Sequence, residues 1–396
     1  MAWEPGRVLI VGAGLAALRG AEALREAGFS GPLTIVGDEP HFPYDRPPLS
    51  KHVLTGAIPA EATTLPGIGA LAAEWQLGSA AQRLDRQART VSLADGRILP
   101  YDRLRIATGT RARPWANPHE GRLAGVFTLR GRDDAAALRR ALAAGPKHVL
   151  VIGAGFIGCE VASLCRQLDL PVTLVEPGPT PLGRGLGSTV GAFIGAIHEG
   201  HGVALRCGRE VEWLEGRDGR LVRAHLVDGS SLAADIAVIA LGAVRNTEWL
   251  DGAGLSADPG GVDCDARGHV LDTDGRPDPR IAAAGDVARF PHPLYDGRRV
   301  ALEHWSHAVA QGVHAGRLLA GAEPGAPYGA LPTFWSTQGD LVVKSVGLTE
   351  GADAVAITQG DAAAGRIVAT YGREGRCIAA VSVDSARWLP AHAELV

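Results

Sequence analysis

The sequence predicts an α/β protein with two parallel-sheet domains and a small α+β domain at its C-terminal end. Three features carry this prediction. A strand, a glycine turn, a helix and a second strand follow one another near the N-terminus, and the same unit starts again at Val149. Beyond residue 328 the chain then carries several short strand-like runs. Strands alternating with helices favour a parallel sheet, whereas consecutive strands favour an antiparallel one.

The first unit starts with a β-branched run at residues 8–11, which predicts a buried strand. The turn Gly12-Ala-Gly14-Leu-Ala-Ala17 follows, and it opens an amphipathic stretch that predicts a helix over residues 15–27. Residues 33–36 form the next apolar run and are followed by Asp38 and Glu39. This order predicts a βαβ unit of about 30 residues.

The second unit repeats this order. Residues 149–152 predict a strand, and the turn Gly153-Ala-Gly155-Phe-Ile-Gly158 opens a helix that reaches about residue 168. A second strand at residues 172–175 is followed by Glu176. Each copy therefore has a strand before the glycines, a helix after them and an acid at the end of the next strand.

This full context is the fingerprint of a Rossmann-like dinucleotide-binding domain, although a βαβ unit without a ligand is the alternative. The first glycine allows a tight turn, and the second lets the backbone approach a pyrophosphate. The third position, Ala17 or Gly158, allows close packing of helix and strand. Two fingerprints imply two dinucleotides.

The acid in each unit indicates which dinucleotide it binds. A carboxylate at Glu176 accepts a hydrogen bond from the ribose 2′-hydroxyl of NADH and repels the 2′-phosphate of NADPH. Pro177 to Pro181 bring no arginine, although Arg184, which we also expect to contact the cofactor, is near. We therefore expect NADH in the second unit and FAD in the first, with Asp38 or Glu39 on the adenosine ribose.

Composition excludes several other classes of protein. The formal charge of −4 argues against a nucleic-acid partner held by a basic field, and no apolar run is long enough for a membrane span. Glycine is abundant at 53 of 396 residues, without a collagen-like period. Five scattered cysteines without C-x-x-C spacing predict reduced thiols, a cytoplasmic location and no metal site.

Five further segments carry a resemblance to a known family: His41-Phe-Pro-Tyr-Asp-Arg-Pro-Pro-Leu-Ser-Lys51, Leu104-Arg-Ile-Ala-Thr-Gly109, Ile281-Ala-Ala-Ala-Gly-Asp286, Glu303-His-Trp305 and Phe334-Trp335-Ser336. In this order they resemble the FAD/NAD(P)-dependent two-dinucleotide flavoprotein reductases of glutathione-reductase-like architecture. Within these, the sequence is similar to the NADH-dependent ferredoxin reductases of oxygenase systems, such as putidaredoxin reductase and the biphenyl dioxygenase ferredoxin reductase. The resemblance covers nearly the whole chain.

The resemblance implies roles for individual residues. It places Asp38 on the FAD ribose, Arg46 on the pyrophosphate and Lys51 beside the isoalloxazine. It also pairs Lys51 with Glu160, at the place where nicotinamide docks, so these two are the expected catalytic residues. The other implied cofactor contacts, including backbone of the glycine turns, are Ala16, Ala17, Ala81, Thr108, Gly109, Arg113, Arg130, Ile157, Gly242, Asp286, Trp305 and Trp335.

The resemblance also implies a reaction and a partner. Hydride would pass from NADH to FAD, and single electrons would then pass to a ferredoxin or rubredoxin that serves a cytochrome P450 or a Rieske oxygenase. The chain has no cysteine set for an iron–sulfur cluster, so this carrier is a separate protein. The stretch 37–51 has no cysteine, which argues against disulfide reductases.

Two alternatives stay open at this point. One is an NADH oxidase or quinone reductase that needs no protein carrier. The other is a redox-sensing flavoprotein similar to apoptosis-inducing factor. The sequence departs from the family pattern at Ser336-Thr-Gln-Gly-Asp340 and at Trp388-Leu-Pro390, which bears on the identity of the partner.

The order of the motifs predicts three domains. A discontinuous FAD-binding domain is expected at residues 1–112 and 236–322, with an NAD-binding domain inserted at 113–235. An α+β domain is expected at 323–396, with strands at 341–346, 354–357, 367–371 and 377–383.

Overall fold

The computed structural model describes residues 6–321 and 326–396. The chain forms two compact units, and each unit is assembled from three separate segments. The first contains residues up to 45, 64–111 and 244–332, and the second contains 46–63, 112–243 and 333–396. The chain passes between the units at Asp45, at Thr64, near β8 (Thr110–Ala112) and β17 (Ala243–Arg245), and before β24 (Thr333–Gln338).

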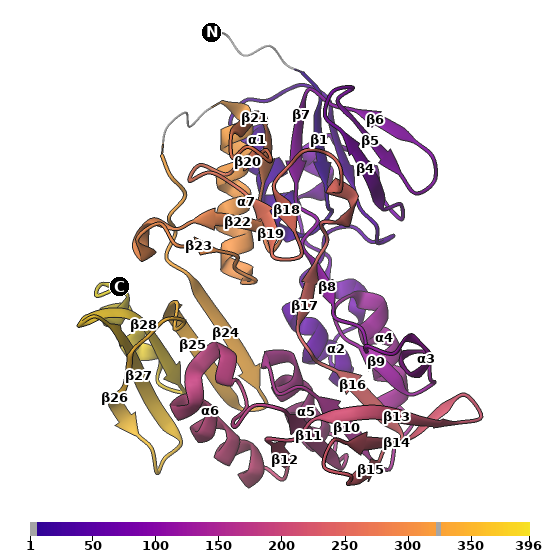
Figure 1. Cartoon of the computed structure of the whole chain (residues 1–396), viewed down its shortest axis with the longest axis vertical. Helices are drawn as coiled ribbons and strands as arrows, with labels where there is room; N and C mark the ends of the chain where they lie inside the picture. Colours follow the sequence, from indigo (N-terminus) through magenta and orange to yellow (C-terminus); the bar gives the residue numbers. More distant parts are fainter. Residues whose placement is uncertain (1–5, 322–325) are drawn as a thin grey trace. The chain divides into compact units, whose positions relative to one another are not determined.

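A six-stranded sheet forms the centre of the first unit (Figure 1). Its order is β20 (His269–Leu271), β21 (Pro277–Ala283), β7 (Arg103–Ile106), β1 (Val8–Val11), β2 (Leu33–Val36) and β3 (Glu74–Gln76). All neighbours are parallel except β20 and β21. Fully apolar strands such as β1 are buried on both faces, as the β-branched run predicts.

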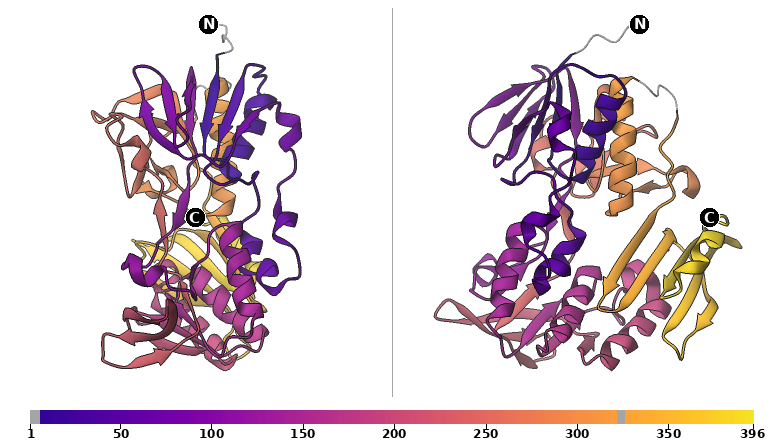
Figure 2. Two further views of the ribbon diagram at one scale, coloured as in Figure 1. Left: turned by 90° about the vertical axis from the view of Figure 1, so that its right-hand side faces the viewer. Right: turned by 180° about the vertical axis from the view of Figure 1, so that it is seen from behind.

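Two helices lie side by side against this sheet, α1 (Leu15–Glu26) and α7 (Trp305–Ala320), as Figure 2 shows. Small residues let their backbones approach closely. A Cβ atom on Gly312 would lie 2.7 Å from the carbonyl oxygen of Ala16, and one on Gly316 would lie 2.3 Å from that of Gly20. The glycines of α7 are therefore required by packing.

Two smaller sheets complete the first unit. One is antiparallel and contains β4 (Ala81–Asp85), β5 (Thr90–Leu93) and β6 (Ile98–Pro100). The other contains β18 (Ala257–Asp258), β19 (Gly261–Asp263), β22 (Ala288–Pro291) and β23 (Arg299–Val300).

A parallel five-stranded sheet forms the centre of the second unit. Its order is β12 (Ala204–Cys207), β11 (Val172–Glu176), β10 (Val149–Ile152), β16 (Ile236–Ile239) and β9 (Val126–Thr128). An antiparallel sheet of β13 (Val211–Arg217), β14 (Arg220–Leu226) and β15 (Ser231–Ala233) follows in the chain. The helices of this part are α2 (His52–Thr55), α3 (Pro118–Gly121), α4 (Arg132–Ala143), α5 (Phe156–Gln167) and α6 (Gly183–Gly200).

The C-terminal part of the second unit is an antiparallel sheet with one short helix, α8 (Leu389–Ala393). Its order is β24, β25 (Leu341–Gly347), β28 (Arg376–Val383), β27 (Arg366–Arg373) and β26 (Ala354–Asp361). The expected α/β class with a small α+β C-terminal domain is confirmed. Strand β24 contains Phe334 and Trp335 and was not expected as a strand.

The two compact units divide the chain differently from the three expected domains. The C-terminal part belongs to the second unit from residue 333 on, residues 326–332 belong to the first unit, and two further segments change place. Residues 236–239 were expected in the first domain, but β16 pairs with β10 and so belongs to the second sheet. Residues 46–63 were also expected in the first domain, but they pack with the second unit, where α2 contacts α4. Both differences arise from contacts between segments far apart in the sequence, which local patterns do not encode.

Two kinds of feature are absent from residues 6–321 and 326–396. No helix there is long and apolar enough to cross a membrane. No group of three or more histidine, cysteine, aspartate or glutamate side chains in these residues is arranged to hold a metal ion.

A buried histidine in the first unit makes a specific pH dependence predictable. His307 is 3% exposed, stacks on Phe290 and has Nδ1 3.0 Å from the hydroxyl oxygen of Tyr328. Burial lowers the pKa of His307 to about 4. In the unfolded chain the pKa of this histidine has its ordinary value of about 6.5. The stability that the protein has above pH 6.5 is therefore partly lost as the pH falls from 6.5 towards 4, because the folded state resists protonation of His307.

We expect His307 to lower the free energy of unfolding by about 2 kcal/mol when the pH falls from 7 to 5. Urea unfolding of the wild type and of His307→Gln at the two pH values measures this cost. On acidification, His307→Gln should lose less free energy of unfolding than the wild type. The control His119→Gln, which changes an exposed histidine, should lose as much as the wild type. An equal loss in His307→Gln and the wild type would exclude His307 as the source.

Candidate functional site

The first glycine turn is open on the side where a pyrophosphate would lie. Gly12 has a φ of +110°, and a Cβ atom there would lie 2.0 Å from the carbonyl oxygen of Ala107, so the fold itself requires this glycine. A Cβ atom on Gly14 would meet nothing within 4 Å. The open position at Gly14 leaves room for a ligand to approach the backbone closely. Ala16 and Ala17 lie buried in the first turn of α1.

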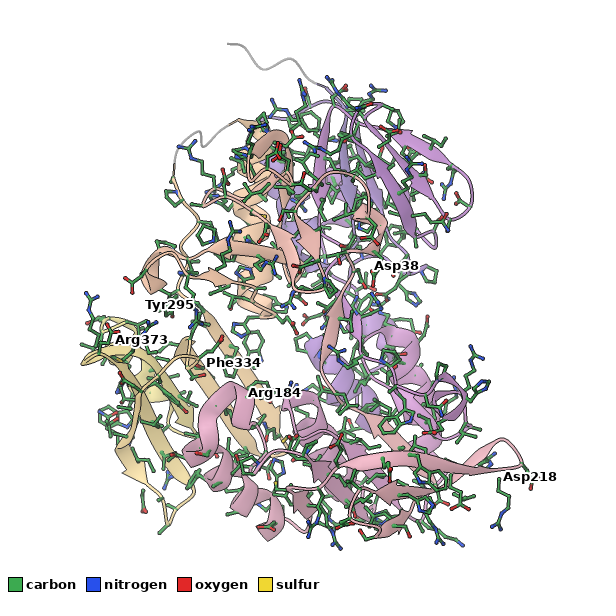
Figure 3. The ribbon with its side chains drawn as sticks, in the orientation of Figure 1. Asp38, Arg184, Asp218, Tyr295, Phe334 and Arg373 are labelled. Carbon is green, nitrogen blue, oxygen red and sulfur yellow. The ribbon has the colours of Figure 1, made fainter. Side chains whose placement is uncertain are left out.

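The two acids after β2 have different surroundings. The carboxylate of Glu39 accepts a hydrogen bond from the hydroxyl of Tyr44 at 2.5 Å. Asp38 is exposed, and its Oδ1 accepts a hydrogen bond from the backbone N–H of Glu39 at 3.0 Å (Figure 3). Asp38 is therefore the acid with more accessible oxygen atoms, and the geometry favours it for the ribose.

The strand ends near β7 and β21 supply further groups in the first unit. Thr110 Oγ1 donates to Asp286 Oδ2 at 3.2 Å, and Gly285 has a φ of +80°. The backbone N–H of Gly285 donates to Gln311 Oε1 at 2.8 Å, so α7 fixes this turn. Trp305 Nε1 donates to Asp45 Oδ1 at 2.7 Å. The patterns gave no signal for Gln311 or Asp45.

The segment of Thr108 and Gly109 is held by a residue that the patterns also missed. Thr108 Oγ1 donates to the backbone oxygen of Asn246 at 2.8 Å, and Asn246 Nδ2 donates to the backbone oxygen of Thr108 at 2.9 Å. Gly109 has a φ of +59° and open space at its Cβ position. Ala81 lies in β4, on another sheet of this unit.

The second glycine turn repeats the geometry of the first. A Cβ atom on Gly153 would lie 2.5 Å from the carbonyl oxygen of Ala240, and one on Gly158 would lie 2.0 Å from that of Gly153. Gly155 has open space at its Cβ position. Ile157 is 40% exposed in the first turn of α5. Both turns therefore combine glycines that the fold requires with one whose open Cβ position leaves room for a ligand to approach the backbone.

Glu176 ends β11 and faces backbone N–H groups. Its Oε2 accepts from the N–H of Ala154 at 2.8 Å, and its Oε1 accepts from the N–H of Gly178 at 2.9 Å. These bonds orient the carboxylate next to the second glycine turn. Gly242, with a φ of +89° and an open Cβ position, accepts a hydrogen bond from the backbone N–H of Arg113 at 2.9 Å.

The segment that carries Arg184 is held by the C-terminal sheet. Helix α6 is interrupted at Gly187, which has φ +72° and ψ 171° and releases backbone oxygens before it. Thr349 Oγ1 donates to the backbone oxygen of Gly185 at 2.6 Å. The hydroxyl of Tyr371 donates to the backbone oxygen of Leu186 at 2.5 Å. Figure 3 shows Arg184 at the start of α6.

The expected ion pair between Lys51 and Glu160 is present in the second unit. Lys51 Nζ lies 2.7 Å from Glu160 Oε2, and their side chains are 18% and 5% exposed. Ser50 Oγ donates to the same oxygen at 2.5 Å, and Ser336 Oγ donates to Glu160 Oε1 at 2.6 Å. A buried carboxylate requires such donors, because it loses its hydration on burial. The patterns gave no signal for Ser50 or for a role of Ser336.

Three other expected residues also lie in the second unit. Arg46 Nη1 donates to the backbone oxygen of Arg130 at 2.8 Å, which brings these two arginines together. Trp335 lies on β24 and is 42% exposed. Phe334, the residue before it, contacts Phe156 of the second glycine turn edge to face, with 4.9 Å between the ring centroids.

Comparisons with known proteins agree with this arrangement. Residues 6–312 match the family model described as pyridine nucleotide-disulphide oxidoreductase, and residues 333–396 match the reductase C-terminal model. The ferredoxin–NAD(+) reductase component of the anthranilate 1,2-dioxygenase system from Burkholderia cepacia is 36% identical over 395 residues, which cover 98% of this chain and 93% of that protein. Putidaredoxin reductase from Pseudomonas putida is 38% identical over 357 residues, 88% and 82% of the two chains.

A solved structure is similar over nearly the whole chain. The covalent putidaredoxin reductase–putidaredoxin complex matches with a TM-score of 0.91 and 32% sequence identity, over 99% of this chain and 94% of that chain. The ferredoxin reductase of the CYP199A2 system from Rhodopseudomonas palustris matches with a TM-score of 0.88 and 33% identity, over 96% and 91%. The chain therefore belongs to the pyridine nucleotide-disulphide oxidoreductase family and carries the reductase C-terminal domain.

Proposed function

We propose that this protein is a ferredoxin reductase that takes electrons from NADH through FAD and passes them to a ferredoxin-type iron–sulfur carrier of an oxygenase system. The observation that carries this proposal is the presence of two glycine turns, each at the start of a helix and each with one glycine whose open Cβ position leaves room for a ligand. Among the relatives named above, the Burkholderia cepacia protein is the reductase component of a dioxygenase system, and the Rhodopseudomonas palustris protein is the ferredoxin reductase of the CYP199A2 system. The carrier in turn serves a cytochrome P450 or a Rieske oxygenase.

FAD, when bound, supplies the chemistry that joins a two-electron donor to one-electron acceptors. The protein residues supply binding and electrostatics. In the first unit, Asp38 and Asp286 are the acids for the ribose and ribitol hydroxyls, and the open backbone at Gly14 receives the pyrophosphate. In the second unit, Gly155 and Glu176 serve NADH in the same way.

In this proposal the Lys51–Glu160 pair would supply a fixed positive charge for the reaction between NADH and FAD. The carboxylate of Glu160 holds the Lys51 ammonium group at 2.7 Å, so its position is set before any substrate arrives. A preorganised cation stabilises negative charge that develops during reduction. This role requires no general acid or base.

The cysteines do not supply disulfide chemistry. All five are free thiols, and burial raises the pKa values of Cys159 and Cys264 far above the ordinary range. Such thiols are inert at neutral pH. Free thiols also support the proposal that the protein works in the reducing cytoplasm.

The function is tested by rapid mixing. The FAD-loaded protein is reduced with NADH and then mixed with a ferredoxin or, separately, with oxygen or a quinone. Fast reduction followed by fast ferredoxin reduction is expected. Fast reoxidation by oxygen or quinone with negligible ferredoxin turnover would favour an oxidase or quinone reductase instead. Slow reduction with a stable charge-transfer band would favour a redox-sensing protein.

The hydrogen bonds around Arg184 predict how the C-terminal sheet acts on NADH binding. Tyr371→Phe removes the donor to the backbone oxygen of Leu186 while keeping the ring. We expect KM for NADH to rise about fivefold, because one buried hydrogen bond contributes about 1 kcal/mol to holding the segment. The rate at saturating NADH should change little, since the hydrogen bond that is lost lies at Leu186 and not in the Lys51–Glu160 pair.

Steady-state kinetics with NADH measure this effect. Tyr101→Phe is the matched control, because Tyr101 is a buried tyrosine of the first unit. A KM for Tyr371→Phe equal to that of Tyr101→Phe would contradict the proposed support of the Arg184 segment.

A further inference from the structure

Glu160 is the end point of a continuous chain of buried hydrogen bonds in the second unit. Ser336 Oγ lies 2.6 Å from Glu160 Oε1, and Gln338 Nε2 lies 3.2 Å from Ser336 Oγ. Next, His198 Nε2 lies 2.8 Å from Gln338 Oε1, and Ser163 Oγ lies 3.3 Å from His198 Nδ1. All five side chains are buried, with His198 only 2% exposed.

The first bond fixes the direction of all the others. Glu160, paired with Lys51, is an ionised carboxylate that only accepts hydrogen bonds, so the hydroxyl of Ser336 donates to it. That donation uses the single hydroxyl proton, and the oxygen of Ser336 therefore accepts from the side-chain amide of Gln338. The amide nitrogen of Gln338 then faces Ser336 and its carbonyl oxygen faces the imidazole of His198.

The tautomer of His198 follows from the orientation of Gln338. The carbonyl of Gln338 accepts, so Nε2 of His198 carries the proton and donates. Burial lowers the pKa of His198, which keeps the imidazole neutral, and a neutral ring protonated at Nε2 accepts at Nδ1. Ser163 is then the donor at the far end. Every bond in the chain donates towards Glu160.

We propose that Ser336, Gln338, His198 and Ser163 are positioning residues that hold Glu160 Oε1 through a one-way series of donors. The other oxygen, Oε2, is thereby left for Lys51 and for the hydroxyl of Ser50. This inference rests on the proposed function, because it gives Glu160 the task of placing the Lys51 ammonium group. Hydrogen bonds aligned in one direction polarise one another and stabilise the charge at the accepting end.

The chain joins three elements that are far apart in the sequence. Helix α5 carries Glu160 and Ser163, α6 carries His198, and β24 carries Ser336 and Gln338. The C-terminal sheet thus contributes two polar side chains to the same unit as the NADH-binding turn. Removing a member from the middle leaves a buried polar group without its partner, which costs more than the bond itself contributes.

The first test measures the tautomer of His198 directly. Nitrogen-15 NMR of histidine-labelled, FAD-loaded protein reports which ring nitrogen carries the proton, and the signal that is lost in His198→Gln identifies His198. We expect the Nε2-protonated form at neutral pH. An Nδ1-protonated ring would reverse the bonds at both ring nitrogens, and a doubly protonated ring would make Nδ1 a donor to Ser163, so that either form would overturn the proposal.

A second arm changes the accepting end. In Glu160→Gln the side-chain amide can donate as well as accept, so the direction of the series is no longer imposed and the His198 signal should shift. Glu212→Gln is the matched control, since Glu212 is an exposed acid on β13 of the same unit. Equal His198 signals in Glu160→Gln and Glu212→Gln would contradict the coupling.

A third arm measures the consequence for the reaction. Ser336→Ala should lower the rate of flavin reduction at saturating NADH about tenfold, because a hydrogen bond to a charged group is lost. Ser336→Thr, which keeps the hydroxyl, should restore the rate. The control is Ser382→Ala: Ser382 is buried in β28 of the same sheet, and its hydroxyl has no hydrogen-bond partner in the part of the chain that the structure describes. Equal rates for the two alanine variants would overturn the proposal.

These measurements separate this inference from the proposed function. The NMR signal of His198 does not depend on any electron acceptor, and thermal unfolding verifies that each variant is folded. A wild type that keeps the expected tautomer but reduces no ferredoxin would contradict only the proposed function. Ferredoxin turnover together with the opposite tautomer would contradict only the hydrogen-bond series.

Discussion

Lys51→Met is expected to lower the rate at which NADH reduces the FAD-loaded protein by about a hundredfold. Methionine keeps the length and apolar stem of the side chain but removes the charge. In the wild type the ammonium group lies 2.7 Å from the carboxylate of Glu160. This carboxylate is itself held by hydrogen bonds from the hydroxyls of Ser50 and Ser336. Rapid mixing at saturating NADH measures the limiting rate, so that weaker NADH binding does not enter the result.

The small number of lysines provides a close control for this variant. The chain has three lysines, and Lys147 is an exposed residue of the same unit. Lys147→Met should reduce at the wild-type rate. A wild-type rate in Lys51→Met as well would remove the proposed role of this residue.

Lys51→Met also leaves the carboxylate of Glu160 buried without a cation. Breaking a buried ion pair from one side typically costs about 3–5 kcal/mol, although the hydroxyl donors of Ser50 and Ser336 reduce this cost here. The double variant Lys51→Met/Glu160→Gln should therefore be more stable than Lys51→Met alone, and equally slow to reduce. Urea unfolding and rapid mixing of both variants separate the electrostatic role from a loss of stability.

The second large effect is expected at Glu176. In the double variant Glu176→Ala/Pro177→Arg, the ratio of kcat/KM for NADPH to that for NADH should rise about a hundredfold. Removal of the carboxylate ends its repulsion of a 2′-phosphate. It also frees the backbone N–H groups of Ala154 and Gly178, which donate to Glu176 in the wild type at 2.8 and 2.9 Å. The new arginine supplies a charged partner for the phosphate.

Steady-state kinetics with both nucleotides measure this ratio. Glu212→Ala removes an exposed acid on β13 and should leave the ratio unchanged. Glu176→Ala alone should lose NADH efficiency more than it gains NADPH efficiency, because the freed N–H groups are weaker phosphate partners than arginine. An unchanged ratio in the double variant would exclude Glu176 as the residue that selects the nucleotide.

Local features of the sequence were sufficient for the elements around both glycine turns. The expected helix over residues 15–27 is α1 at Leu15–Glu26, and the expected strand at 149–152 is β10. These elements follow from β-branched runs, helical periodicity and glycines that need a positive φ, and each of these acts over a few residues.

Local sequence patterns could not predict the contacts between segments that are far apart in the chain. The assignment of residues 236–239 to the second sheet depends on the pairing of β16 with β10, nearly 90 positions earlier in the chain. In the first unit, buried Arg105 donates to the backbone oxygens of Ala16 and Ala17 and lies where a Cβ atom on Gly20 would be. Nothing near Arg105 in the sequence distinguishes it from an exposed arginine.

The sequence by itself determined two dinucleotide-binding units, because the turn, the helix start and the acid of each lie within about 30 residues. Only the tertiary structure decided how Glu160 is held. Its partners Ser50 and Ser336 are 110 and 176 positions away, and a hydroxyl becomes a donor to a given carboxylate only when folding brings both within hydrogen-bond distance. The direction of the bonds from Ser163 to Glu160 likewise follows from the buried charge at one end.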